Sequence, residues 1–179
     1  MNFFHYFYVQ PMDMVFLEMA LMFAVWTVFI TLLKGKVKRY TALFFAAAAV
    51  IGILLTTVLR RQNNSAYEVN FIPFYTFVAA KVQPELYRTM AMNVFLFMPL
   101  GMSMPFALGG KVKRKVIITV LFALALSVAV ELVQLALSRG MCDIDDVICN
   151  TLGAFLGSVS FIISSRISKF IDKHKTNRG

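Results

Sequence analysis

The sequence predicts an all-α protein, a polytopic bundle of about five transmembrane helices. Of its 179 residues, 59% are hydrophobic and only 15% are charged, which is more apolar surface than one soluble core of this size buries. The apolar residues fall into five runs, each close to the ~20 residues that cross the hydrocarbon of a bilayer. No polar stretch is long enough to fold separately, so residues 1–179 are expected to form one domain.

The five apolar runs are expected to form the helices in chain order. They are Met12–Leu33, Tyr40–Leu59, Ala91–Leu108, Val116–Ser138 and Val147–Ile167. The fifth helix is expected to open a turn earlier, near Asp143. The third run is short and contains Pro99 and Pro105, each of which removes a main-chain donor. These prolines predict a kinked or broken helix, which is tolerated where neighbours satisfy the freed carbonyls.

Basic residues indicate the orientation of the bundle. Most of the 18 Lys and Arg residues follow the first, third or fifth run, where residues 168–179 form a basic tail. The positive-inside rule therefore places the C-terminus in the cytoplasm and the N-terminus outside. The pI near 9.8 raises nucleic-acid binding as a function. Short basic clusters between apolar runs are better explained by membrane orientation, so no nucleic-acid partner is expected.

The longest outer connection, residues 60–90, contains an apolar and aromatic stretch at residues 69–77 that includes Asn70. This stretch is too short to span a bilayer. We expect it to be an interfacial or re-entrant piece that packs on the bundle.

Polar residues gather toward the outer ends of the last three predicted helices. Ser127, Glu131 and Gln134 are spaced by three and four residues and therefore share one helical face. A carboxylate inside the hydrocarbon costs a few kcal/mol unless it has a partner or water, so Glu131 is expected to face the bundle interior. Asp146 and Asn150 share a face of the fifth helix in the same way.

The start of the fifth helix has a structural explanation of its own. Asp143 is placed to cap the helix, and Asp145 and Asp146 lie in the first turn, where the helix dipole favours acids. Gly153 and Gly157 continue the polar face as a GxxxG motif that lets another helix approach closely. Interhelical hydrogen bonds would account for the other polar residues one by one.

Taken together, these residues favour a binding or catalytic pocket at the outer face, because they map to one depth and one side. Glu131 and Asp146 are the candidate catalytic residues. The candidate ligand-binding residues are Asn70, Asn93, Gln134, Arg139, Asp143 and Asn150. A divalent cation is a candidate cofactor, with Asp143 and Asp146 as its ligands.

Four stretches of the sequence resemble the VanZ-like family of bacterial membrane proteins. They are residues 70–74, 93–101, 127–134 and 139–157, and the resemblance is strongest over residues 69–157. The resemblance implies a multi-pass protein of the bacterial cell membrane. The family takes its name from a member linked to low-level resistance to the glycopeptide teicoplanin. Its chemistry is poorly defined, so the resemblance does not imply that this chain is an enzyme.

Three functions fit these residues. The first is a site that binds or modifies a membrane lipid or a lipid-linked wall precursor, which would reduce susceptibility to glycopeptides. In it, Arg139 would pair with a phosphate or carboxylate, and Glu131 would act as a general acid or base. The second is a small transporter or channel. The third is a non-enzymatic partner of a membrane complex, in which the polar residues hold the helices together.

Overall fold

The computed structural model describes residues 11–59, 69–137 and 142–176. Its five long helices all have the length and composition to cross a membrane. They are α2 (Met12–Leu32), α3 (Gly35–Leu54), α5 (Glu85–Ala107), α6 (Val112–Ala136) and α7 (Ile144–Thr176). The short elements are the π-helical turn η1 (Leu55–Leu59), the helix α4 (Tyr75–Ala79) and the strands β1 (Val69–Asn70) and β2 (Cys142–Asp143). The predicted helical bundle is confirmed.

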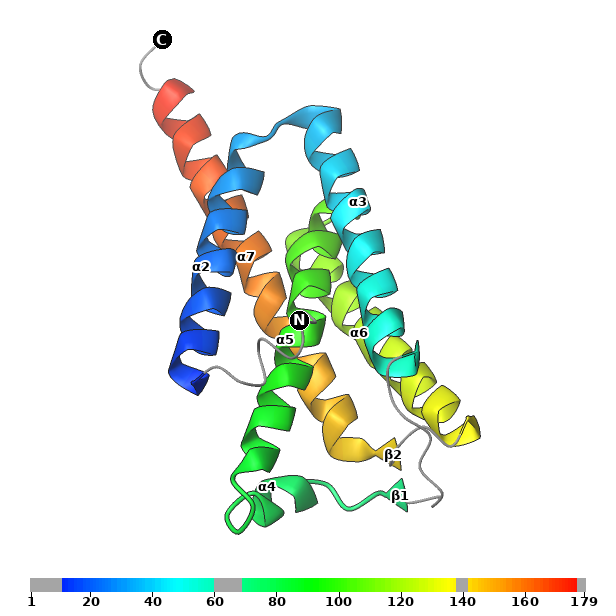
Figure 1. Ribbon diagram of the computed structural model, residues 1–179. Coiled ribbons are helices and arrows are strands. Elements are labelled where there is room, and N and C mark those ends of the chain that lie inside the picture. The colour runs from blue at the N-terminus through cyan, green and yellow to red at the C-terminus, as the bar shows by residue number, and fades with distance from the viewer. Residues whose placement is uncertain (1–10, 60–68, 138–141, 177–179) are drawn as a thin grey trace.

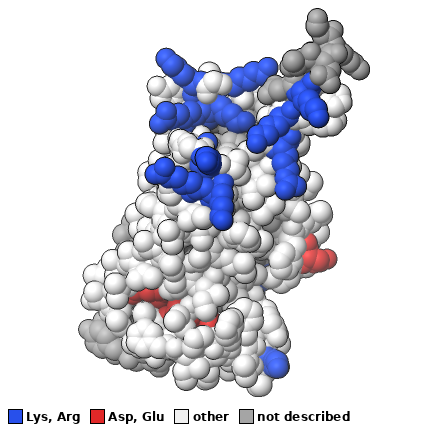
Figure 2. All heavy atoms as spheres, turned by 180° about the vertical axis from the view of Figure 1, so that it is seen from behind, with Lys and Arg blue, Asp and Glu red and all other residues white. Residues whose placement is uncertain are grey.

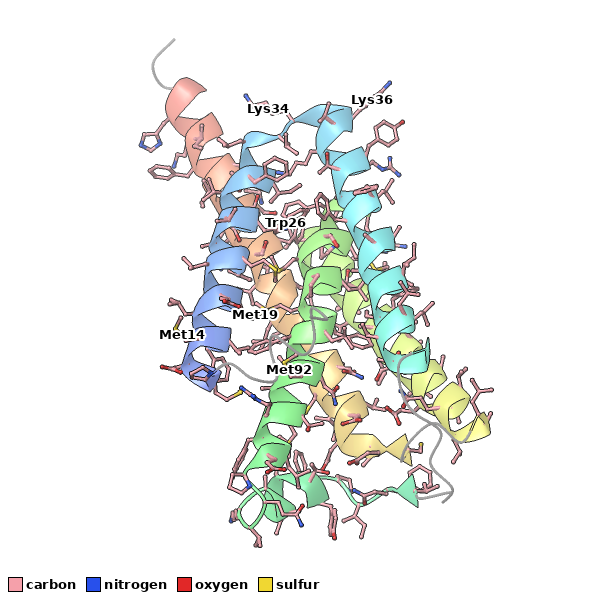
Figure 3. The ribbon with its side chains drawn as sticks, in the orientation of Figure 1. Met14, Met19, Trp26, Lys34, Lys36 and Met92 are labelled. Carbon is pink, nitrogen blue, oxygen red and sulfur yellow. The ribbon has the colours of Figure 1, made fainter. Side chains whose placement is uncertain are left out.

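Helices α5 and α7 form the centre of the bundle (Figure 1). Helix α3 packs on α5, α6 packs on α7, and α2 packs mainly on α7. Trp26 of α2 donates a hydrogen bond from Nε1 to the carbonyl of Met102 at 2.9 Å, and its ring points toward α5 (Figure 3). The other three helices therefore pack around this central pair.

Glycines allow α5 and α7 to approach closely. A Cβ atom on Gly153 would overlap the carbonyl of Val94, and one on Gly101 would overlap the carbonyl of Ala154. Gly157 likewise lies against the main chain of α5. The close packing predicted from the GxxxG motif is confirmed, and α5 is the helix that it admits.

The third membrane helix is longer than predicted. The sequence predicted a short, kinked or broken helix over Ala91–Leu108, whereas α5 begins more than a turn earlier and continues through both prolines without a break. Pro105 leaves the carbonyl of Gly101 without its usual main-chain donor. Ser158 Oγ of α7 donates to the carbonyl of Ala154 in its own helix at 2.9 Å and lies 3.4 Å from the carbonyl oxygen of Gly101. A polar side chain of a neighbouring helix therefore approaches the carbonyl that Pro105 leaves without its main-chain donor.

Three helices also extend further into the basic segments than predicted. Helix α3 begins at Gly35 rather than Tyr40, and α6 begins at Val112 rather than Val116. Helix α7 continues to Thr176, so most of the predicted basic tail is helical. Lys and Arg are good helix formers, and the short α2–α3 connection leaves little chain for a separate loop.

Charge divides the molecule into two ends. Figure 2 shows most of the visible Lys and Arg side chains gathered at one end, with basic atoms also visible at the opposite end, and the Asp and Glu side chains visible in that view lie away from the main basic group. This basic end comprises the α2–α3 connection, the α5–α6 connection and the C-terminal part of α7. The opposite end, where α4, β1 and β2 lie, is called the acidic end below. The separation agrees with the expected placement of the basic end in the cytoplasm, which stays a prediction.

A small parallel strand pair closes the acidic end. Val69 pairs with Cys142, and Asn70 pairs with Asp143. Helix α4 follows β1 and packs on α5. The stretch around Asn70 therefore packs on the bundle, as the sequence predicted, although the prediction of an all-helical chain did not include the strands.

Candidate functional site

Buried carboxyl and amide side chains meet at the acidic end. Four carboxylates among the described residues of this end are more than nine-tenths buried, in side chains that come from α6, β2 and α7. Buried charges are stable only when hydrogen-bonded, so each carboxylate needs donors from the surrounding elements. We call this group the acid–amide cluster. Its members are Asn70, Asn93, Glu131, Asp143, Asp145, Asp146 and Asn150.

Asp143 joins three elements at the edge of the cluster. Its Oδ1 accepts hydrogen bonds from the N–H of Asp145 at 2.9 Å and from Nδ2 of Asn70 at 3.2 Å. Its Oδ2 accepts a hydrogen bond from Oγ1 of Thr76 at 2.8 Å. The bond to Asp145 is that of a helix N-cap, because α7 begins at Ile144. The predicted capping role of Asp143 is confirmed, and the same carboxylate holds β1 and α4 in place.

Glu131 reaches this edge from α6. Its side chain is buried, as the predicted inward face of α6 requires, and Oε2 accepts the N–H of Asp143 at 3.2 Å. Cys142 lies buried beside it. Burial raises the pKa of the Cys142 thiol, and the carboxylates of Glu131, Asp143 and Asp146 raise that pKa further. Three carboxylates therefore act on one thiol, which shows how compact the cluster is.

Asp146 and Asn150 connect α7 to the neighbouring helices on either side. Asn93 of α5 donates from Nδ2 to Oδ1 of Asp146 at 2.5 Å. Asn150 donates from Nδ2 to Oγ of Ser127 on α6 at 2.8 Å. Within the described part of the chain, the buried Oδ1 of Asn150 has no hydrogen-bond donor. An acceptor of this kind costs about 1–3 kcal/mol when it stays unmatched.

Asp145 was not among the predicted site residues, yet it organises the cluster. It is fully buried, and its two oxygens accept the main-chain N–H groups of Phe74 at 2.6 Å and Thr76 at 2.8 Å. Phe74 has φ of 64°, in the left-handed region that non-glycine residues seldom adopt. The carboxylate of Asp145 thus holds the strained start of α4. The sequence indicated only an acid in the first turn of a helix.

Gln134 and Arg139 complete the predicted ligand-binding residues. Gln134 donates from Nε2 to the carbonyl of Thr57 in η1 at 2.8 Å, so this bond ties α6 to the end of α3. Arg139 lies outside the described residues. The structure brings six of the eight predicted residues to the acid–amide cluster. They are Asn70, Asn93, Glu131, Asp143, Asp146 and Asn150.

The described residues do not fit a divalent cation well. No group of three or more His, Cys, Asp or Glu side chains among them is arranged to hold a metal ion. Asp143, one of the two predicted ligands, already accepts three hydrogen bonds, one of which is the helix cap. Divalent cations in proteins usually take several oxygen ligands. We therefore assign no chemical step to a cation here.

Two apolar grooves lie beside the cluster's helices. One, of about 450 Å³, runs between α3 and α6 and is lined only by aliphatic side chains, including Val130 and Val133, which flank the cluster's Glu131 in sequence. The other, of about 360 Å³, lies between α2, α3 and α5. Figure 3 shows two of its lining residues, Met19 and Met92, on α2 and α5. Both grooves have the lining that suits hydrocarbon.

Comparison with known proteins gives one match. A model of the family described as VanZ/LLP1 matches residues 21–165, from within α2 to within α7. The matched region contains the whole acid–amide cluster. No curated protein and no solved structure matches the chain significantly.

Proposed function

This chain belongs to the VanZ/LLP1 family, and from that premise we propose that its acid–amide cluster binds or modifies an amphiphilic molecule of the bacterial cell envelope. The candidate ligands are a membrane lipid and a lipid-linked wall precursor. Holding or altering such a molecule would reduce susceptibility to glycopeptide antibiotics of the teicoplanin type, since their action depends on the cell envelope.

One observation carries the proposal. Asn150 Oδ1 is buried without a donor among the described residues, in a cluster that otherwise offers carboxylates. This unmatched acceptor favours a ligand that brings a donor of its own, because a matched acceptor recovers part of its desolvation cost. Sugar hydroxyls, ammonium groups and peptide N–H groups are such donors. They occur in lipid head groups and in wall precursors.

The phosphate of such a ligand needs a different partner, because the carboxylates would repel it. Arg139, three residues before β2 in the sequence, is the residue expected to pair with it. The ligand's chain would lie in the aliphatic groove between α3 and α6. Val130 and Val133 line that groove on the same helix as Glu131, so a head group and its chain would meet the protein on neighbouring surfaces.

The experiment compares conservative variants in bacteria that lack the endogenous protein. Glu131→Gln and Asp146→Asn each remove one charge from the cluster and keep the size of the side chain. Glu85→Gln is the matched control, because Glu85 is an exposed acid at the same end, in the first turn of α5. For each strain, folded protein in the membrane, the teicoplanin concentration that stops growth and the envelope-lipid profile are measured.

The two cluster variants are expected to fold but to lose both the teicoplanin resistance and the envelope-lipid profile of the wild type. The control is expected to behave as the wild type. Folded cluster variants with wild-type resistance and lipids would show that the site does not do this work. Losses that only track the amount of folded protein would assign the cluster to helix association alone. Either result would overturn the proposal.

A further inference from the structure

The basic end contains a second site, built on a pair of aromatic rings. Phe106, near the end of α5, and Phe161 of α7 pack edge to face with ring centroids 5.0 Å apart. Nζ of Lys38 on α3 lies 5.0 Å from the centroid of Phe106. Nζ of Lys115 on α6 lies 5.2 Å from the centroid of Phe161. Four helices thus bring two ammonium groups to one aromatic pair.

These two lysines differ from the other basic residues near them. Lys38 and Lys115 are partly buried, whereas Lys36 and Lys113, two residues earlier on the same helices, are exposed. Figure 3 shows Lys36 pointing away from the bundle. The partly buried pair lies over an apolar cluster of the core that includes both rings. Of these two lysines in the first turns of each helix, one is therefore partly buried and the other is exposed.

The charge of this pair is not balanced by acids that the structure describes. Lys38 and Lys115 carry like charges, and both side chains are partly buried at the same aromatic pair, where a charge is less well solvated than in water. The described acidic side chains belong to the acidic half of the molecule, at the start of α2 and α5 and in the cluster. The next acid along α7, Asp172, follows Phe161 by about three helical turns.

An anion bound at this aromatic pair would offset the cost of partly burying two like charges. Each aromatic ring attracts the cation next to it, but this interaction is typically weaker than a charge-assisted hydrogen bond. The rings also carry no net charge, so they do not neutralise the lysines. A phosphate accepts bonds from two ammonium groups at once. At the end of a membrane bundle, the phosphates present at high concentration are those of lipid head groups, and basic pockets between helices bind them.

We propose that Lys38 and Lys115, seated on the Phe106–Phe161 pair, form a binding site for the phosphate head group of an anionic membrane phospholipid. The site is separate from the acid–amide cluster and does not depend on the function proposed for it. Phospholipid phosphates lie at both faces of a bilayer, so the inference holds for either orientation. The bound lipid would join α3 to α6 at the basic end of the bundle.

The test uses the full-length protein in detergent with an equal mixture of phosphatidylglycerol and phosphatidylcholine. Native mass spectrometry measures which lipid stays bound. The double variant Lys38→Gln/Lys115→Gln is compared with the control Lys36→Gln/Lys113→Gln, which removes the same charge from the same two helices. The wild type and the control are expected to retain phosphatidylglycerol preferentially. The Lys38/Lys115 variant is expected to lose this preference by roughly tenfold or more.

Equal losses in both double variants would show a general effect of charge and would overturn the proposal. Displacement of the lipid by an equal concentration of inorganic phosphate would also overturn it, because the site would then serve free phosphate. If the Lys38/Lys115 variant does not fold, each single substitution is compared with its exposed neighbour. The proposal then requires a larger loss at Lys38→Gln than at Lys36→Gln, and at Lys115→Gln than at Lys113→Gln; equal losses refute it.

Discussion

Replacing Asp145 with alanine tests how the acidic end is held together. The carboxylate of Asp145 accepts two main-chain N–H groups, those of Phe74 and Thr76. A hydrogen bond to a charged group contributes about 1.5–3 kcal/mol, so Asp145→Ala removes about 3–6 kcal/mol of local stability. The variant also removes the cost of burying a charge, which offsets part of this loss. The lower value is therefore the better expectation.

The loss should appear as faster hydrogen exchange of the two amides. Each 1.4 kcal/mol is a factor of ten in an equilibrium, so about 3 kcal/mol corresponds to roughly two orders of magnitude in exchange rate. Exchange is followed by mass spectrometry on peptides that cover residues 69–80 of the purified protein. Asp145→Asn keeps one acceptor oxygen and should give an intermediate rate.

Glu85→Gln serves as the control, because it removes an exposed acid from the same end and should leave exchange unchanged. Wild-type exchange rates in Asp145→Ala would refute the reasoning. Such a result would mean that the strained start of α4 is held by contacts other than this carboxylate.

Two further outcomes follow from other parts of the molecule. Gly153→Ala should lower the stability to unfolding in sodium dodecyl sulfate by about 1–3 kcal/mol, because the new Cβ overlaps α5. Gly52→Ala, which meets open space, should cause no loss; equal losses would contradict this. In a variant without Cys149, maleimide should label Cys142 slowly at neutral pH and faster as the pH rises above the usual thiol pKa of about 8.5, because burial and nearby acids raise that pKa. Glu131→Gln should lower the apparent pKa of labelling; an unchanged value would contradict the assigned cause.

Features that depend on neighbours along the chain were predictable from the sequence. Composition and run length predicted the five membrane helices, and these are confirmed. The spacing of Glu131 and Gln134 predicted a buried face of α6, and both side chains are buried. The GxxxG spacing predicted close packing, and the N-cap of Asp143 follows from its place before an apolar run. Each of these signals lies within one or two helical turns.

Features that depend on distant partners were not predictable in the same way. Asp145 looks like an ordinary first-turn acid, because the main-chain groups that it binds lie about seventy residues earlier. The strand pair joins Asn70 to Asp143 across a similar separation. The surroundings of Pro105 also involve another helix, since Gly101 lies against α7 and Ser158 of α7 approaches its carbonyl. The sequence of α5 alone does not show such a contact.

Helix α7 is longer than the hydrocarbon layer of a bilayer. Its 33 residues rise by about 50 Å, whereas the hydrocarbon is about 30 Å thick. Its apolar span ends at Ile171, and a helix that is longer than the hydrocarbon tilts or extends into the head-group layer. The residues that follow Ile171 are therefore expected among the lipid head groups, where a water-soluble probe would reach them.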